Sequence, residues 1–588
     1  ISTPRSKRRL SHPMNRYDYF HTNVAKLYFD RTRFHAPFQH TTAFNVGDIV
    51  PLEVEEIYPG DGLNSHLSFL IRSFTPIAPQ MSNMYLDVYS FFVPYRIVWE
   101  HWENFYGQND TSAWTSQLEY VIPAADVDPD NVKLDSVTGF LPESGTLADY
   151  LGIVIGDDSG DFDQNGDQVS DLYRRAYLKI YNDWFRDENW QAPILFGVGD
   201  SVLSGEDYTY WSPLLTANKF HDYFTAVLPD TQKGTPVDVG GYGPVVVGAD
   251  HLSQLVNPET PEGTSVYGMN FVKSQTSEHW TFSSEVSSSS VGFIPNSGSG
   301  NYTTSGDGSS RFAVTPSNLW AQWSVTIEDI RNAAVVQHVL EALANSGSRY
   351  PEALIGLWGV RSSDARLQIP EYLGGERFPL NNTEVISTAN TVSGSSGEYL
   401  GQNGAMLKVS NGSGLFNTVF QEHGMLFTVG VVRIEQTYFE GLHRRFSRKS
   451  FFDFYMPQLA NIGYQPIYSS ELIYNDSTDS LKQNVYGFAE AWQELRFSPY
   501  RLSSIMRPGV AASLSYYTAT DEIYGELGYS NDDVTPAGVI PMGKKGFDRT
   551  IAVPSATRGA FQLFGDFKFD NIWTRILPAH SKPGLTRI

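Results

Sequence analysis

Two stretches that alternate with a period of two most constrain how this chain folds. In MYLDVYSFFVPYR, at 84–96, every second residue from Met84 to Val88 is aliphatic, and the residues between them are aromatic or charged. A second such run, rich in Val, Phe and Tyr, is GMLFTVGVVRIEQTYF at 424–439. Because successive side chains of a strand point to opposite faces, this pattern predicts half-buried strands. With 50 Gly and 32 Pro available for turns, we expect a mainly β chain with both strands in a sandwich.

Helices are predicted between the strands. In DLYRRAYLKIYNDWF, at 171–185, apolar residues recur every four positions, flanked by tyrosines, and predict an amphipathic helix whose wide apolar stripe faces a core or an interface. TIEDIRNAAVVQHVLEAL, at 326–343, begins with a capping box from Thr326 to Asp329 and is followed by Gly347 and Pro351, which end helices. The residues expected on one face of this second helix are Ile327, Ile330, Ala334 and Leu340.

Two segments have a Gly/Ser/Asn-rich composition. Residues 236–311 include SSEVSSSSVGFIPNSGSGNYTTSGDGSSR, and residues 388–416 include TVSGSSGEYLGQNG. Such stretches inside a folded pattern are typical of surface insertions or long loops. We therefore expect both segments to be loops outside the β core.

Charge is distributed unevenly along the chain. The net charge is −23, with 42 basic and 65 acidic residues, yet both ends are basic. The N-terminal arm at 1–16 and the C-terminal tail at 571–588 carry the following basic residues: Arg5, Lys7, Arg8, Arg9, Arg16, Arg575, Lys582 and Arg587. Two interpretations stay open: solvated tails, or chain ends that face an anionic partner which the acidic body repels.

Motifs for catalysis and cofactor binding are incomplete. Gly538, Gly543 and Lys544 fit a phosphate-binding loop, but Lys545 stands where Ser or Thr should hold magnesium, so a surface turn is the better interpretation. The loop DSGDFDQNGDQ places oxygen ligands on alternate residues, as in the first half of a calcium loop, but lacks the closing Glu. Its candidate calcium ligands are Asp161, Asp163, Asn165 and Asp167. An acidic solvated loop is the alternative.

Other features narrow the class of protein. Cysteine is absent, which excludes disulfides, thiolate nucleophiles and cysteine-ligated metals. No signal peptide follows the basic start, no stretch is apolar enough to predict membrane insertion, and no catalytic signature is complete. We expect no catalytic residues and no resident cofactor, with calcium as the one candidate ion.

Several long blocks carry a family resemblance. In order they are FDRTRFHAPFQHTTAFNVGDIVPL at 29–52, YLKIYNDWFRDENWQAP at 177–193, NKFHDYFTAVLPDTQKG at 218–234, RYPEALIGLWGVRSSDARLQIPEYLGG at 349–375 and YGFAEAWQELRFSPYRLSSIMRP at 486–508. Together they resemble the major capsid proteins of the microviruses, small tailless phages with circular single-stranded DNA, and within these the gokushovirus branch. The likeness covers nearly the whole chain except the two Gly/Ser-rich segments.

The resemblance implies a fold and a role. It implies one domain at 17–588, an eight-stranded antiparallel jelly-roll sandwich with long insertions that contain helices and loops, assembled into a T = 1 icosahedral shell in the virion. Residues 236–311 would then form surface protrusions for host attachment. The implied partners are other copies of the chain, packaged single-stranded DNA, small basic DNA-binding and scaffolding proteins of the virus, and a host surface receptor. Assembly would take place in the bacterial host cytoplasm.

This role gives the basic clusters a purpose. Basic termini inside a shell would neutralise packaged DNA, because phosphate contacts dominate binding to single strands. HRRFSRKSFF at 443–452 is a second candidate, with Arg444, Arg445, Arg448 and Lys449; the alternative is a salt-bridge patch against acidic groups of neighbouring subunits. Two other classes compete. A secreted β-sandwich carbohydrate-active enzyme offers no reason for basic termini, and an adhesin usually has repeats, which this sequence does not show.

Overall fold

The computed structural model describes most of the chain. The described residues are 31–108, 120–126, 144–153, 168–200, 211, 213–235, 327–380, 403–474, 484–498, 501–519, 522–524, 527 and 534–578, with the backbone of short strands at 243–244, 271–272, 279–282, 293–295, 320–321 and 382–386. The chain divides into two compact units, Ile1–Lys233 with Ala342–Ile588, and Gly234–Glu341.

Two antiparallel sheets dominate the first unit. The five-stranded sheet has the order β1-β18-β3-β14-β13, with bounds Thr32–Phe44, Leu563–Arg575, Gly62–Ser73, Asn403–Val419 and Asn382–Ile386. The four-stranded sheet has the order β12-β4-β15-β2, with bounds Glu371–Leu380, Met84–Pro94, Gly424–Ile434 and Val50–Ile57. The prediction of a mainly β chain with antiparallel sheets is confirmed.

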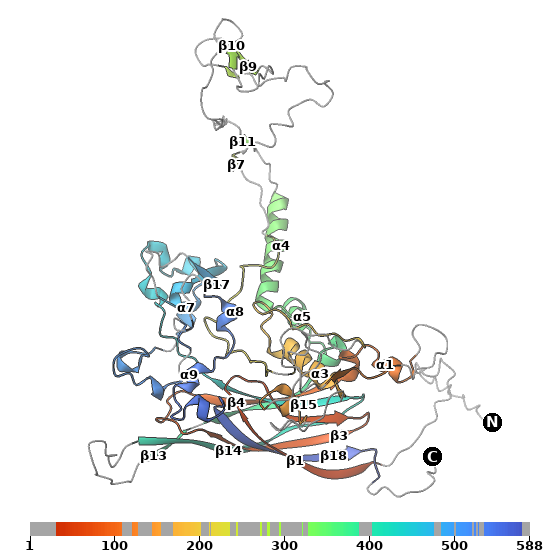
Figure 1. Cartoon of the computed structure of the whole chain (residues 1–588). Helices are drawn as coiled ribbons and strands as arrows, with labels where there is room; N and C mark the ends of the chain where they lie inside the picture. Colours follow the sequence, from red (N-terminus) through yellow and green to blue (C-terminus); the bar gives the residue numbers. More distant parts are fainter. Residues whose placement is uncertain are drawn as a thin grey trace, which may run out of the picture. The chain divides into compact units, whose positions relative to one another are not determined.

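The two sheets pack face to face as a sandwich (Figure 1). On β18 the inward residues Phe567, Phe569 and Trp573 are buried, whereas Phe564 and Lys568, which point to the other face, are exposed. These aromatic side chains share one core with residues of the other sheet such as Leu86 and Val432. The period-two pattern of a sheet with one covered face therefore holds for β18 and β3.

The four-stranded sheet corrects one expectation. β4 and β15 were predicted to be half-buried, but nearly every residue of β15 is buried. The reason is a second core on the far side of this sheet, where Phe91, Phe427 and Val429 pack against helix α3, Leu172–Ile180 (Figure 1). A strand covered on both faces is apolar throughout, so alternation alone could not reveal the helix above it.

Helix α3 confirms the amphipathic prediction and adds a buried ion cluster. The predicted face holds, since Leu172, Ala176 and Ile180 are buried, and the helix runs on into a π-helical turn at Tyr181–Phe185. Arg174 and Arg175 are also buried, and both donate to the Asp171 carboxylate, from Nε atoms at 2.7 and 2.6 Å. Two guanidinium groups thus share one buried carboxylate, which offsets their desolvation.

The remaining elements of the first unit are short. Its other helices are α1 at Trp102–Phe105, α2 at Leu147–Tyr150, α5 at Tyr350–Trp358, α6 at Asp364–Leu367, α7 at Gln493–Arg496, α8 at Pro536–Val539 and α9 at Lys545–Asp548. Two small hairpins pair β5, Ala124–Asp126, with β6, Gln168–Ser170, and β16, Tyr464–Tyr468, with β17, Val485–Glu490. Single 3-10 turns lie at Tyr95–Ile97, Arg444–Phe446, Phe451–Asp453, Pro457–Leu459, Ser469–Glu471, Ser504–Met506, Ser515–Tyr517 and Ser555–Thr557.

The second unit contains short strands and most of helix α4. Here β7, Gly243–Pro244, pairs with β11, Trp320–Ala321, and a small sheet joins β8, β9 and β10, at Phe271–Val272, His279–Phe282 and Phe293–Pro295. Helix α4, Ile327–Ser346, confirms the second helix prediction, and Gly347 follows it with φ at 105°. Several apolar side chains of this helix are exposed: Ile330 is 49% exposed, and Val335 and Val336 are 60% and 49% exposed.

Two boundaries from the sequence are corrected. Residues 403–416 were expected to be loop, but they belong to the long strand β14, because the backbone pairs with β13 up to Leu407 and with β3 from Lys408 onward. Residues 571–575 were expected to begin a tail, but they complete β18 opposite β1. Residues 236–242, 388–402 and 579–588, which belong to the predicted insertion, loop and tail, lie outside the described residues.

A buried carboxyl group links the two sheets. Glu53 on β2 accepts a hydrogen bond from the Asn571 side chain on β18, and Thr428 on β15 donates to its second oxygen at 3.5 Å. Burial raises the pKa of Glu53 to about 8, against a partial lowering by the hydrogen bond from Asn571. The folded chain therefore holds a proton on Glu53 more tightly than the unfolded chain does.

This raised pKa predicts a pH-dependent stability. Protonated Glu53 contributes its full stabilisation below the unfolded pKa near 4.5, and the contribution is lost as pH rises through about 8. Glu53→Gln removes the titration, so the melting temperature of the wild type should fall relative to that of the variant between pH 5 and pH 8. Calorimetry across this range checks it, with the exposed Glu376→Gln as control. A difference between Glu53→Gln and wild type that does not change with pH would contradict this assignment.

Candidate assembly and nucleic-acid interfaces

The predicted DNA-binding residues fall into three groups in the structure. Those of the arm and the far tail lie outside the described residues, as does the predicted calcium loop: Arg5, Lys7, Arg8, Arg9, Arg16, Lys582, Arg587, Asp161, Asp163, Asn165 and Asp167. Arg575 lies at the end of β18, and the cluster at 444–449 lies in the segment after β15. The calcium site stays a prediction, and in the described residues no group of three His, Asp or Glu side chains is placed to hold a metal.

The two ends of the described chain lie together. β1 and β18 pair along their full length, and Thr32, the first residue of β1, is the register partner of Arg575, the last residue of β18. The basic arm precedes β1 and the basic tail follows β18. The chain therefore enters β1 and leaves β18 at the same end of one strand pair.

Arg575 itself is held within the chain. Its Nε lies 3.0 Å from Asp61 Oδ2, its Nη2 donates to the backbone oxygen of Glu56 at 2.7 Å, and its guanidinium stacks on Trp573 at 3.8 Å from the ring centre. These contacts fasten the end of β18 to the turn between β2 and β3. Arg575 therefore has a structural role that sequence reasoning did not find, and its contact with DNA stays a prediction.

The basic side chains of the cluster at 444–449 are divided between half-buried and exposed ones. Arg448 Nη2 donates to Glu494 Oε1 at 3.1 Å, and Arg444 lies 3.8 and 3.9 Å from Glu471 and Glu494. Burial raises the pKa of Glu471, and Arg444 offsets part of that rise. Arg444 and Arg448 therefore pair with carboxylates of their own chain, whereas the alternative of salt bridges to neighbouring subunits stays a prediction.

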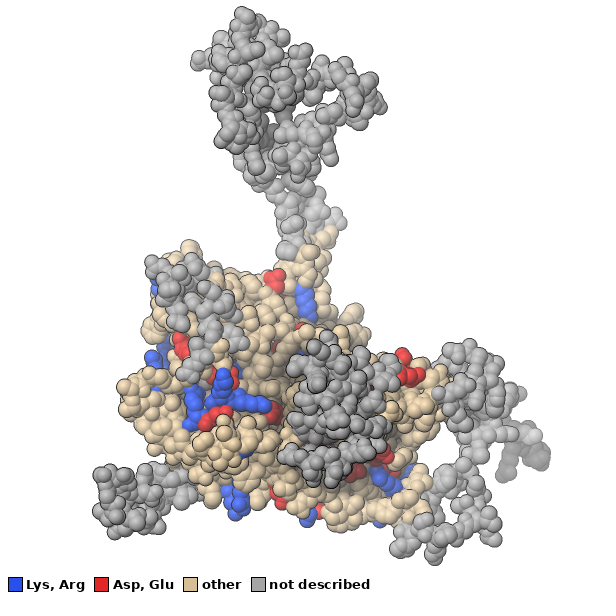
Figure 2. Space-filling view, in the orientation of Figure 1, with Lys and Arg blue, Asp and Glu red and all other residues tan. Residues whose placement is uncertain are grey.

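The exposed part of this segment is aromatic. Arg445 and Lys449 are exposed, and with them lie the following large side chains, each about half exposed or more: Phe446, Phe451, Phe452, Phe454 and Tyr455. Figure 2 shows basic and acidic side chains intermixed on the visible face, rather than one cationic field. An exposed aromatic cluster of this size marks a surface that another molecule covers.

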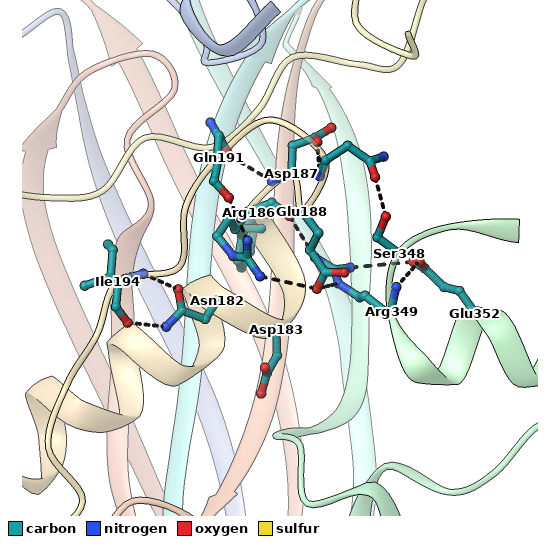
Figure 3. Close-up of polar contacts among 12 residues, drawn as sticks. Asn182, Asp183, Arg186, Asp187, Glu188, Gln191, Ile194, Ser348, Arg349 and Glu352 are labelled. Carbon is teal, nitrogen blue, oxygen red and sulfur yellow. Dashed lines mark hydrogen bonds and ion pairs between the residues drawn. The ribbon is translucent and has the colours of Figure 1, made fainter. Parts of the chain in front are cut away.

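A cavity of about 650 Å³ lies between the segment after α3 and the start of α5. Figure 3 shows Arg186, Glu188 and Arg349 meeting there. Arg349 Nε donates to Glu188 Oε1 at 2.7 Å, Arg349 Nη2 donates to the backbone oxygen of Arg186 at 2.8 Å, and Arg186 Nη2 lies 3.6 Å from Glu188. Because each charge meets an opposite charge or a carbonyl, the network fastens two insertions together and does not form an acid–base pair for catalysis.

A second cluster of paired charges borders the same cavity. Asp87, buried on β4, accepts from Arg377 Nε at 2.6 Å and from Arg433 Nη1 at 2.9 Å, and both guanidinium groups lie over the ring of Phe220. Asp87 was predicted only as the polar position of a strand. Its partners on β12 and β15 are distant in sequence, so only the strand register brings them together.

Comparison with known proteins agrees with these features of a subunit that assembles through its surface. A family model described as "Capsid protein (F protein)" matches residues 22–585. The chain is 33% identical over 576 residues to capsid protein VP1 of Spiroplasma virus 4, which covers 95% of this chain and 96% of the relative. It is 31% identical to VP1 of Bdellovibrio phage phiMH2K, over 92% and 97%, and 29% identical to VP1 of Chlamydia phage 1, over 95% and 96%.

These matches define a class and then a family. The class is that of structural shell proteins of viruses. The chain belongs to the phage capsid family of the F protein, and the predicted resemblance to microvirus major capsid proteins is confirmed. It is a structural component of the virion rather than an enzyme, so the carbohydrate-active alternative is wrong. Among the described helices, none has the length and hydropathy needed to cross a bilayer.

The exposed aromatic cluster gives a prediction about self-assembly. Replacing Phe451 and Phe452 together with Ser removes apolar area that an interface would bury, at about 25 cal/mol per Å². The side chains are about 70% exposed, so the subunit should fold normally while assembling into fewer particles. Sedimentation of the assembly products at a fixed protein concentration measures this.

The matched control is the double change Phe451→Leu and Phe452→Leu, which keeps an apolar surface. It should assemble close to the wild-type yield. If the serine variant forms particles as efficiently as the leucine variant, the aromatic cluster is not part of a subunit interface.

Proposed function

We propose that this capsid protein is an eight-stranded jelly roll that forms a T = 1 icosahedral shell around circular single-stranded DNA. The strand order supports the fold. Setting β13 aside, the long strands in chain order are β1, β2, β3, β4, β12, β14, β15 and β18. Numbered by their order in the chain, these strands lie in the order 1-8-3-6 in one sheet and 5-4-7-2 in the other. The pairing of the first strand with the last supports a jelly-roll arrangement.

The meeting of the chain ends is the observation that carries the DNA role. Thr32 and Arg575 are register partners, so the strand ends that lead to the arm and to the tail lie at one place on the sandwich. Two cationic segments on an otherwise acidic protein would concentrate positive charge on one side of the shell wall. We assign that side to the DNA, which the arm would neutralise through Arg5, Lys7, Arg8, Arg9 and Arg16 and the tail through Lys582 and Arg587.

The cluster at 444–449 has a smaller part in this proposal. Arg444 and Arg448 are held by Glu471 and Glu494, so the side chains available to phosphates are Arg445 and Lys449. Small basic proteins of the virus would supply further positive charge, and scaffolding proteins would assist assembly, as the family resemblance implies.

The insertion at 236–311 is assigned to surface protrusions that bind a host receptor. Two observations support a separate role for it. Residues Gly234–Glu341, which contain it, form a compact unit of their own. Helix α4 at the end of that unit exposes Ile330, Val335 and Val336, which leaves apolar surface for contact with another molecule.

Neutralising the arm tests the DNA role. Replacing Arg5, Lys7, Arg8 and Arg9 with Ala should leave assembly largely intact and reduce the DNA per particle, because phosphate neutralisation dominates single-strand binding. Genome copies per capsid, by quantitative amplification against protein mass, measure it. The control exchanges Arg for Lys and Lys for Arg at the same four positions, which keeps the positive charge. Particles of the alanine variant with a full genome would refute a DNA role for the arm.

Removing the insertion tests attachment. Deleting residues 240–308 should leave particles that assemble and no longer bind host cells, because the deletion lies within the second unit. Electron microscopy of the particles and cell-binding assays separate the two effects. If no shells form, the segment is an assembly element and the attachment role is wrong.

A further inference from the structure

Two cations lie next to each other on the free face of the five-stranded sheet. Arg72 on β3 and Lys408 on β14 are register partners, and both side chains are exposed. Like charges directly opposite on neighbouring strands destabilise a sheet. Neither side chain forms an ion pair with another residue in the part of the chain that the structure describes. The pair is therefore a locally unfavourable arrangement that an anion would relieve.

Two carboxylates of this face, both on β18, are already engaged. Asp566 accepts hydrogen bonds from Gln39 at 2.8 Å and from Thr41 at 3.0 Å. Asp570 lies 3.5 Å from Lys568 Nζ and 3.9 Å from His35. Both are on β18, whereas the Arg72–Lys408 pair is on the next two strands of the sheet.

The surroundings of the pair suit a nucleotide chain. Phe564 on β18 is the register partner of Arg72 on its other side and is 38% exposed, with Phe74 packed edge-on against it at 5.6 Å between ring centres. On β3 and β14 the outward positions next to the pair are Leu70, Met406 and Ser410, with Ser68 and Gly412 one step further along. An aromatic ring beside two cations offers stacking for a base and charge for its phosphates.

The free face of this sheet is not covered by any described helix (Figure 1). The opposite face of β3 and β18 is buried in the sandwich. The strand pair from which both basic chain ends leave, β1 and β18, belongs to this same sheet. The net charge of the whole chain is −23, so the positive charge of this patch is opposite in sign to that of the chain as a whole.

We propose that the free face of sheet β1-β18-β3-β14 binds single-stranded DNA, with Arg72 and Lys408 on successive phosphates and Phe564 under a base. This inference rests on the proposed function, since it names the surface of the subunit that meets the packaged genome. It adds residues in the folded sandwich to the chain ends already assigned to DNA.

The test compares the full-length wild-type subunit with two double variants. Arg72→Gln with Lys408→Gln removes both charges, and Arg72→Lys with Lys408→Arg keeps them. Binding of a fluorescent oligo(dT) 20-mer is measured by anisotropy over a series of salt concentrations. Each phosphate contact on a single strand contributes about 0.7 to the slope of log affinity against log salt, so the glutamine variant should lose about 1.4 of that slope. The charge-keeping variant should retain the wild-type slope.

Particle assembly separates the possible failures. If wild-type subunits form shells and the glutamine variant keeps both its slope and its genome content, the DNA-binding face is wrong while the capsid function stands. If the glutamine variant folds, as judged by its melting temperature, but forms no shells, the face is a contact with another protein and the inference is overturned. If wild-type subunits form no shells at all, the proposed function itself fails.

Phe564→Ala is an independent third variant. Losing one stacked base should weaken binding by roughly 5- to 150-fold, the equivalent of 1–3 kcal/mol, without changing the salt slope. A salt slope that falls with this uncharged substitution, or an unchanged affinity, would contradict the assigned role of the ring.

Discussion

The pairing of the first long strand with the last one is the constraint on which the rest of the structure depends. β1 and β18 are in register from Thr32 with Arg575 to Phe44 with Leu563, so the beginning and the end of the described chain are joined in one sheet. This closure completes the inner face of the five-stranded sheet, where Phe567 and Phe569 meet the opposite sheet. It also fixes the starting points of both basic chain ends, which links the fold directly to the placement of charge.

Charged side chains inside the first unit are neutralised locally. Asp171 holds two arginines on α3, Asp87 joins Arg377 and Arg433 across three strands, and Glu494 holds Arg448. Such networks fix the geometry of long insertions on the sandwich, because an unpaired buried charge is costly. Exposed cations without a carboxylate partner in the described part of the chain, such as Arg72 and Lys408, can then indicate where an anionic partner binds. A shell protein needs this separation, since its two faces meet DNA and solvent.

The sequence predicted the β class, helices α3 and α4 and the family, because each depends on local patterns or on long blocks of residues. Alternation at 84–96 found β4 but not its second buried face, which depends on α3 packing from elsewhere in the chain. The Gly/Ser-rich composition of 403–416 concealed β14, since small residues suit an exposed sheet face as well as a loop. The Arg72–Lys408 pair could not be predicted from the sequence, because strand register joins residues that lie far apart in the chain.

A cryo-electron microscopy reconstruction of DNA-filled particles would show whether the cationic residues of the subunit are gathered on the inner side of the shell wall. We expect icosahedral shells in which the free face of sheet β1-β18-β3-β14 points to the interior, with density for nucleic acid beside Arg72 and Lys408. A reconstruction with that face turned to the outside, or covered by a neighbouring subunit, would show that the cations are not sorted in this way.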